Sequence, residues 1–253
     1  MTMSPATAES VQDAAPVALI IGAGSHIGRA ALSLLRAQHP DWEIVAVSRD
    51  TATLPAMPGL HAIASDHSEA SQQAVATRLA GVRGRVQRVI LCLGVLHNAQ
   101  LRPEKRLEDL HQDSVLEYLR INTVLPALWL KTLLPLLSGA QACSVAVLSA
   151  RVGSIADNRK GGWYGYRASK AALNMLLQTT AIEYGRRAPN VSLLAYHPGT
   201  VDTPLSAPFH RSVPEGVLQQ PQETAAALLA LMESAGTPGT ARFVDYAGES
   251  VPW

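Results

Sequence analysis

The chain has 253 residues, of which 47% are hydrophobic and 16% are charged, with 21 basic and 20 acidic residues and a formal net charge of +1. A chain this long and apolar can bury a large core, which excludes intrinsic disorder for most of its length. The balanced charge does not indicate a nucleic-acid partner. The two cysteines, Cys92 and Cys143, lie far apart within apolar runs, which excludes a disulfide scaffold or a cysteine metal site.

We expect no signal for export or membrane insertion in these 253 residues. Residues 1–15 are small and polar, with no basic start followed by an apolar stretch, so we expect a flexible tail. The longest apolar run, residues 124–137, contains Pro126, Lys131 and Pro135 and is shorter than the roughly 20 residues that span a bilayer. We expect a cytoplasmic protein without a membrane partner, folded as one domain over residues 16–253.

Short β-branched segments alternate with longer helical patterns along the whole chain. The expected strands are 17–21, 43–48, 61–64, 86–93, 144–149, 191–196 and 242–244. The expected helices are 26–38, 68–80, 113–137, 164–186 and 221–234, the third with a kink at Pro126. This alternation predicts an α/β fold: a single Rossmann-like, doubly wound domain, with a parallel sheet of about seven strands and helices on both faces.

A glycine-rich turn links the first strand to the first helix. Glycines permit a tight turn and let the backbone approach a pyrophosphate, whose charge the helix N-terminus favours. The spacing is one residue longer than the usual dinucleotide fingerprint, and a structural strand-to-helix turn is the alternative. The residues that we expect to bind a cofactor here are Gly22, Gly24, Ser25, His26, Ile27 and Gly28.

The end of the second strand normally lies near the adenosine ribose, where an acidic residue favours NAD and an arginine accommodates the extra phosphate of NADP. Here Ser48 and Arg49 come first, and Asp50 stands one residue too late to be the obvious ribose ligand. Arg49 can form a bidentate pair with a phosphate and Ser48 can donate a hydrogen bond. We therefore expect NADP as the cofactor rather than NAD, the alternative being that Arg49 is a solvated surface residue.

Tyr166 and Lys170 lie four residues apart in a predicted helix and therefore on one face. A tyrosine hydroxyl exchanges protons poorly near pH 7, because its ordinary pKa is about 10. A lysine ammonium beside it stabilises the phenolate and lowers that pKa. Such a tyrosine can pass a proton to a carbonyl oxygen while hydride reaches the carbon. An exposed Tyr–Lys pair without function is the alternative.

The order and spacing of the motifs resemble those of the short-chain dehydrogenase/reductase family, over nearly all of the chain from Val17 to Trp253. The motifs are the glycine turn, Tyr166-x-x-x-Lys170 and the downstream segment 197–203. Within the family, the segments 103–107, 161–164 and 246–253 are similar to those of the C-factor and Sniffer-like carbonyl reductase branch. The resemblance implies an oxidoreductase with a small-molecule carbonyl or alcohol substrate. The histidines lack metal-ligand spacing, so we expect no metal site.

The resemblance also implies a role for each matching residue. Tyr166 would be the acid/base, Lys170 would lower its pKa and bind the nicotinamide ribose, and Asn122 would hold a water in a proton relay. Leu93 and Gly94 would pack under the cofactor, and Asp66 would meet the adenine. The residues implied at the nicotinamide end are Pro198, Gly199, Val201 and Thr203.

Three positions depart from the family pattern. His26 replaces the middle glycine of the turn, and Leu91-Cys92-Leu93-Gly94 keeps only the glycine of an Asn-Asn-Ala-Gly segment. The serine that polarises the substrate carbonyl, three residues before Gly153, is Ala150. We expect Ser149 to take this role, with Ser154 as the alternative, since losing such a donor costs about 10²–10³ in rate.

Two functions therefore compete. The first is an NADP-dependent carbonyl reductase or alcohol dehydrogenase that uses Tyr166; the second is a cofactor-binding sensor or signalling protein on the same scaffold with weak or no catalysis. Residues 204–220 have loop composition and are expected to form a mobile lid. The two long helices are compatible with a homodimer or homotetramer, and the sequence does not choose among the assemblies or name the substrate.

Overall fold

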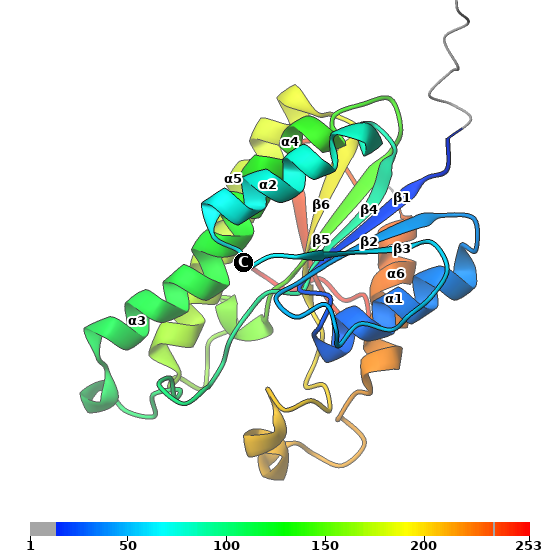
Figure 1. The fold of residues 1–253 in the computed structure, drawn as a ribbon. Helices are drawn as coiled ribbons and strands as arrows, with labels where there is room; N and C mark the ends of the chain where they lie inside the picture. The colour runs from blue at the N-terminus through cyan, green and yellow to red at the C-terminus, as the bar shows by residue number, and fades with distance from the viewer. Residues whose placement is uncertain (1–13, 235) are drawn as a thin grey trace, which may run out of the picture.

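The computed structural model describes residues 14–234 and 236–253, so residues 1–13 of the expected tail lie outside the described part. Seven parallel strands form one sheet in the order β3-β2-β1-β4-β5-β6-β7 (Figure 1). This confirms the expected doubly wound α/β domain. The strands are β1 (Val17–Ile21), β2 (Glu43–Ser48), β3 (Leu60–Ala64), β4 (Val86–Leu91), β5 (Cys143–Leu148), β6 (Val191–His197) and β7 (Ala241–Asp245).

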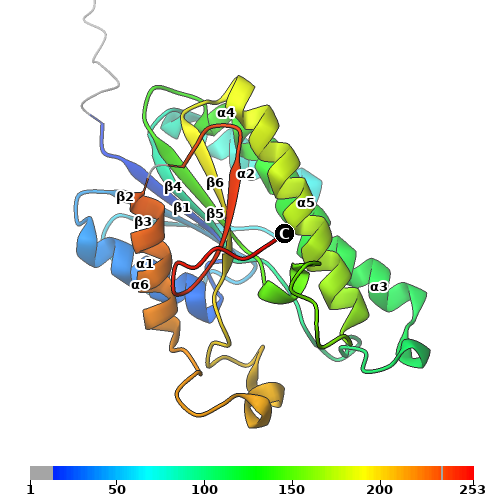
Figure 2. The same cartoon turned by 180° about the vertical axis from the view of Figure 1, so that it is seen from behind.

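Helices cover both faces of the sheet. Helices α1 (His26–Gln38) and α6 (Pro221–Glu233) lie side by side on one face, and α2 (Glu69–Arg78), α4 (Leu125–Leu137) and α5 (Tyr164–Arg187) lie on the other (Figures 1 and 2). Helix α3 (Gln112–Leu119) extends beyond the sheet and packs against α5. The strand order reverses between β1 and β4, the place where open α/β sheets bind ligands.

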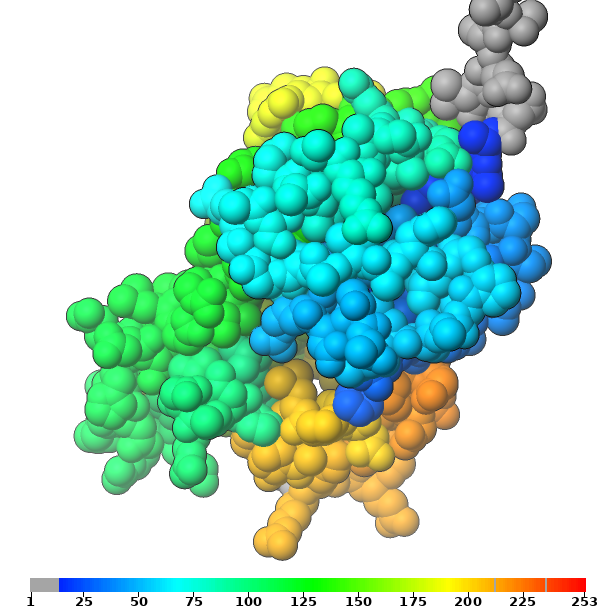
Figure 3. Space-filling view, in the orientation of Figure 1, coloured from blue at the N-terminus to red at the C-terminus, as the bar shows by residue number. Residues whose placement is uncertain are grey.

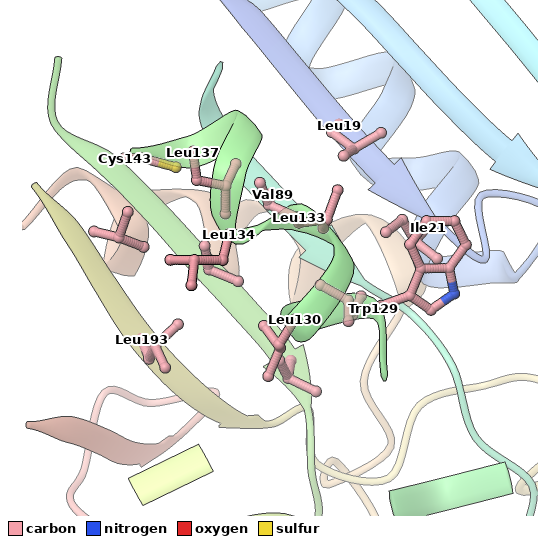
Figure 4. Close-up of a cluster of buried hydrophobic side chains, with 14 of the residues drawn as sticks. Leu19, Ile21, Val89, Trp129, Leu130, Leu133, Leu134, Leu137, Cys143 and Leu193 are labelled. Atoms are coloured by element: carbon pink, nitrogen blue, oxygen red, sulfur yellow. The ribbon is translucent and has the colours of Figure 1, made fainter. Parts of the chain in front are cut away.

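The core has two parts because the strands bury both of their faces. All five residues of β1 are buried, and their side chains alternate between the two clusters. On one face α4 contributes Trp129, Leu130, Leu133, Leu134 and Leu137, which lie against residues of β1, β4 and β6 (Figure 4). Within the described part of the chain, no helix combines the length and the apolar character that a membrane span requires.

Some expected boundaries were wrong. The fourth strand ends at Leu91 instead of Leu93, because the chain then turns toward Asn122, which hydrogen-bonds both Val95 N and Val95 O. The expected helix 113–137 is two helices joined by a π-helical segment, Arg120–Val124. Pro126 is the second residue after this segment. It has no N–H for the carbonyl of Asn122, four residues earlier, which explains a local break in the α-helical hydrogen-bond ladder. Asn122 lies within this π-helical segment, and such segments are frequent at functional sites.

Candidate functional site

A cavity of about 300 Å³ opens at the carboxyl ends of the central strands, beside the reversal in strand order. It brings together residues from the turn after β1, the segment after β4, the end of β5, helix α5 and the segment after β6. The lining residues are Ser25, His26, Ile27, Cys92, Leu93, Gly94, Val95, Leu148, Ser149, Tyr166, Lys170, Pro198, Thr203, Pro204 and Leu205.

The glycine turn is closely packed. Gly22 has φ +77°, and a Cβ there would lie 2.7 Å from the backbone oxygen of Cys92. A Cβ on Gly28 would lie 2.9 Å from Gly22 O, and one on Gly24 would lie 2.8 Å from Ser48 Oγ. Side chains at these three positions would therefore displace backbone or neighbouring atoms, which is the physical reason for glycine here.

The turn also leaves the N-terminus of α1 open to an anion. Ser25 caps the helix by accepting a hydrogen bond from Gly28 N at 3.0 Å, and the first turn holds no acidic residue. His26 is exposed and lines the cavity, so its bulk replaces the family glycine without entering the core. A helix N-terminus without a carboxylate of its own favours a phosphate group.

At the end of β2 the side chains are arranged as a turn. Ser48 Oγ donates to Asp50 O at 3.0 Å, and the Asp50 carboxylate accepts from Ala52 N at 2.9 Å. Arg49 is exposed. At the end of β3, Asp66 accepts hydrogen bonds from the hydroxyl and the backbone N–H of Ser68, which lower the pKa of its carboxyl group. The lining of the 300 Å³ cavity does not include Ser48, Arg49, Asp50 or Asp66.

Tyr166 and Lys170 both reach the cavity from one face of α5. The Lys170 ammonium donates to Leu148 O at 2.9 Å and lies 6.0 Å from the centre of the Tyr166 ring. Burial lowers the pKa of Lys170 to about 8, and burial together with Tyr118 raises the pKa of Tyr166 above its ordinary value. In this state Tyr166 is therefore held in its protonated form.

Asn122 lies behind the tyrosine–lysine pair. Its amide bridges Val95 N at 2.7 Å and Val95 O at 3.0 Å and also donates to Ser169 Oγ at 3.0 Å. A Cβ on Gly94 would lie 3.3 Å from Asn122 Oδ1 and 3.4 Å from Lys170 Nζ, so Gly94 passes close to both groups. Asn122 thereby fixes the segment after β4 against α5.

The structure does not place a free serine hydroxyl at the expected oxyanion position. Ser149 lines the cavity, but its hydroxyl donates to Asn174 Oδ1 at 2.6 Å. Ala150 is buried in an apolar cluster that includes Tyr166. Ser154 is buried, accepts a hydrogen bond from Asp157 N and does not line the cavity.

The segment after β6 closes one side of the cavity. Pro198 and Thr203 line it, whereas Gly199 and Val201 lie behind them: Val201 is buried and pairs with Gln219, and a Cβ on Gly199 would meet the Tyr246 ring. His97 Nε2 lies 3.2 Å from Pro204 O and 3.0 Å from Leu205 O. Figure 3 shows this segment (gold) below α1 (blue) and beside the chain that follows β4 (teal to green).

Three residues near the site were not predicted from the sequence. Asn174 stands four residues after Lys170, so the spacing along α5 could have indicated that it shares the face of Tyr166. Glu104 is 3% exposed and accepts a hydrogen bond from Gly165 N, and no local pattern announces this long-range contact. The contact of His97 with the segment after β6 likewise joins residues more than 100 positions apart.

Known proteins are similar to this chain in sequence and in fold. The family model described as short chain dehydrogenase matches residues 16–213. The C-signal protein of Myxococcus xanthus is 34% identical over 109 residues, which are 43% of this chain and 60% of that protein. The match to a Rhodococcus dehydrogenase covers 48% of that protein. The chain thus spans about half to three fifths of the length of these two curated relatives.

Among the solved structures that match over 94% of this chain, two are carbonyl reductases from a bacterium and an insect. A carbonyl reductase from Pseudomonas aeruginosa in complex with NADP has a TM-score of 0.75 at 25% identity and is covered over its whole length. The carbonyl reductase Sniffer of D. melanogaster has a TM-score of 0.78 at 20% identity and is covered over 99% of its length, a likeness of fold. The predicted resemblance is therefore confirmed, and the chain belongs to the short-chain dehydrogenase/reductase family.

Proposed function

We propose that the protein is an NADP-dependent oxidoreductase that interconverts an aldehyde or ketone and the corresponding alcohol, with Tyr166 as the acid/base. One observation carries this proposal: Tyr166 and Lys170 share a cavity with the glycine turn after β1. A proton donor and a dinucleotide-binding turn in one cavity can serve hydride and proton transfer to the same carbonyl group.

The residues around the cavity fit a nicotinamide dinucleotide. The turn after β1 offers glycines without room for side chains and an open helix N-terminus, which suit the pyrophosphate. The bound cofactor would supply the hydride. The proposed contacts are Gly22, Gly24, Ser25, His26, Ile27 and Gly28 at the pyrophosphate, Asp66 at the adenine, Leu93 and Gly94 beneath the cofactor, and Pro198, Gly199, Val201 and Thr203 at the nicotinamide.

The proposed choice of NADP rests on the end of β2. The Asp50 carboxylate is hydrogen-bonded within its own turn, while Arg49 is exposed and can pair with a phosphate. The Pseudomonas aeruginosa carbonyl reductase with 25% identity is solved in complex with NADP. We therefore assign Arg49 to the phosphate on the adenosine ribose, and Ser48 would join it by exchanging its hydrogen bond to Asp50 O for one to the phosphate.

The proton chemistry follows from the environments of two residues. Burial raises the pKa of Tyr166, so the phenol is present as a donor for the oxygen of a carbonyl that receives hydride. Loss of its proton leaves a buried phenolate, which the Lys170 ammonium 6.0 Å from the ring stabilises. The Asn122 side chain already hydrogen-bonds Val95 and Ser169. Its backbone carbonyl lacks the usual helical donor, because residue 126, four positions later, is a proline without an N–H. We therefore assign the relay water to this carbonyl.

Apolar side chains surround Tyr166 beside the cavity, where the substrate would bind. Tyr166 packs in a cluster with Ala150, Leu96 and Leu101, and Trp163 and Phe209 lie against it. Residues 204–220 would form a lid, because Val201 pairs with Gln219 at its base and His97 hydrogen-bonds carbonyl groups within it. These surroundings favour an uncharged carbonyl compound over a charged one.

The test is single-turnover oxidation of NADPH with a panel of aldehydes, ketones and dicarbonyls. Tyr166→Phe should lower the turnover rate by a factor of about 10² or more while NADPH still binds, because only the hydroxyl that donates the proton is removed. Tyr164→Phe is the matched control, since Tyr164 is an exposed tyrosine at the start of the same helix. Equal turnover by the Tyr166→Phe variant would refute the proposed role.

A cofactor-binding sensor is the second candidate, and one observation favours it. Ala150 and the engagement of Ser149 by Asn174 leave Tyr166 without a hydroxyl partner for the substrate oxygen. Tight NADPH binding without oxidation by any carbonyl in the panel would support the sensor. Failure to bind either nicotinamide cofactor would contradict both candidates.

A further inference from the structure

The helix that carries Tyr166 begins only two residues before it, at Tyr164. Trp163 precedes the helix in a left-handed conformation, with φ +55°, and its side chain makes no capping hydrogen bond. The first N–H groups of a helix have no partner within the helix. The start of α5 therefore depends on groups from elsewhere in the chain.

Glu104 supplies those groups from a loop 61 positions earlier in the chain. Its backbone oxygen accepts a hydrogen bond from Trp163 N, and its side-chain Oε2 accepts one from Gly165 N at 3.1 Å. The residue is 3% exposed, so water does not compete for these contacts. A carboxylate at this position also interacts favourably with the positive end of the helix dipole.

Gly165 lets the first turn of α5 approach this group. A Cβ at Gly165 would lie 2.9 Å from Glu104 Oε1 and 2.6 Å from Cδ2 of Tyr118. The Tyr118 ring meets the Tyr166 ring edge to face, with centroids 6.2 Å apart, and the Trp163 ring lies at the same distance on Tyr166. The contacts that hold the start of α5 thus continue directly into the packing of the Tyr166 ring.

We propose that Glu104 is a positioning residue for Tyr166. By accepting hydrogen bonds from Trp163 N and Gly165 N it fixes the first turn of α5, and this turn sets the position of the Tyr166 hydroxyl in the cavity. The inference rests on the proposed function of Tyr166 as acid/base. The hydrogen-bond acceptor, rather than the charge, is the property that performs this role.

Two side-chain variants separate the acceptor from the charge. Glu104→Ala removes the side-chain oxygen that accepts the hydrogen bond from Gly165 N. The kcat should then fall about 10- to 100-fold at unchanged NADPH affinity, since displacement of a catalytic group by about 1 Å can lower the rate 10²-fold. Glu104→Gln keeps an oxygen acceptor at the same reach, and its kcat should stay within about twofold of the wild type. Rates are expressed per NADPH-binding site, so that a loss of folded protein does not imitate a loss of kcat.

Asp109→Ala is the matched control. Asp109 lies in the same loop, and its carboxylate accepts hydrogen bonds from Lys105 N, Arg106 N and the Arg106 guanidinium. Its kcat should not change. Gly165→Ala is an independent variant, because its Cβ would displace the same turn, and it should reproduce the fall in kcat.

Amide hydrogen exchange provides a readout that does not need turnover. The Gly165 amide should exchange at least about 10-fold faster in Glu104→Ala and at the wild-type rate in Glu104→Gln, because only the first variant removes its side-chain acceptor, whereas Trp163 N keeps the backbone oxygen of residue 104 in both. Unchanged exchange, or a kcat of Glu104→Gln as low as that of Glu104→Ala, would overturn the inference. A wild type without turnover but with this exchange pattern would refute the proposed function while leaving the anchoring of α5 by Glu104 in place.

Discussion

Ser149 donates its hydroxyl proton to Asn174 Oδ1 at a distance of 2.6 Å. Both side chains are buried, and Asn174 lies on the face of α5 that also carries Lys170 and Tyr166. The Ser149 hydroxyl is therefore oriented by a residue of α5 and is not directed at a substrate. The neighbouring Ala150 presents a methyl group in the cluster around Tyr166. Neither Ser149 nor Ala150 therefore offers a hydroxyl proton to a substrate carbonyl beside Tyr166.

The first prediction concerns the missing hydroxyl. Ala150→Ser should raise kcat/KM for a carbonyl substrate by about 10-fold or more, because a second donor to the developing oxyanion commonly contributes 10²–10³ in rate. Steady-state kinetics with the best substrate of the panel measures this. Ser149→Ala is the comparison and should lower kcat/KM by less than about threefold. A large loss in Ser149→Ala with no gain in Ala150→Ser would show that Ser149 polarises the substrate after all.

The second prediction concerns the pH dependence of reduction. Burial lowers the pKa of Lys170 to about 8, so its ammonium is lost as the pH rises through this value and the Tyr166 phenolate loses its partner. The kcat for reduction should therefore fall above about pH 8. Lys170→Arg keeps a positive charge to much higher pH and should move this fall upward, at a lower maximal rate. A profile identical in both proteins would assign the titration to another group.

The third prediction concerns stability. The pKa of Lys170 is depressed from 10.5 to about 8 in the folded state, so the unfolded chain binds more protons between these values and stability rises with pH across that window. Lys170→Met should therefore raise Tm at pH 7, and the gain should shrink as the pH approaches 10. Thermal unfolding at several pH values measures the difference. A gain that grows with pH would contradict the depressed pKa.

The fourth prediction concerns the cofactor. Arg49→Ala should weaken NADPH binding by about 10- to 100-fold, as expected for loss of a charge-assisted hydrogen bond worth about 1.5–3 kcal/mol. NADH binding should change by less than twofold, because NADH lacks the phosphate. Fluorescence titration of both cofactors measures the two dissociation constants, with Asp50→Asn as the control at the next position. An equal loss for both cofactors would place Arg49 away from that phosphate.

Particular elements show why the fold was predictable. The runs 17–21 and 43–48 were located to the residue, because continuous apolar β-branched segments between turn residues have few alternatives. The helix 26–38 was also located to the residue, since serine is a strong N-cap and the Ser25 side chain accepts a hydrogen bond from Gly28 N. The π-helical segment 120–124 was not predicted: Pro126 indicated a kink in one helix, whereas the form of the break also depends on the hydrogen bonds of Asn122 to Val95 and Ser169.

By itself the sequence determined the alternation of strands and helices, the glycine turn and the pairing of Tyr166 with Lys170, because these depend on periodicity and on spacing within one element. Only the tertiary structure decided that Asn174 engages the Ser149 hydroxyl, that Glu104 accepts a hydrogen bond from the first turn of α5, and that His97 meets the segment after β6. Hydrogen bonds between distant segments and the burial that lowers the pKa of Lys170 arise when the strands and helices pack together, and no local pattern of residues encodes them.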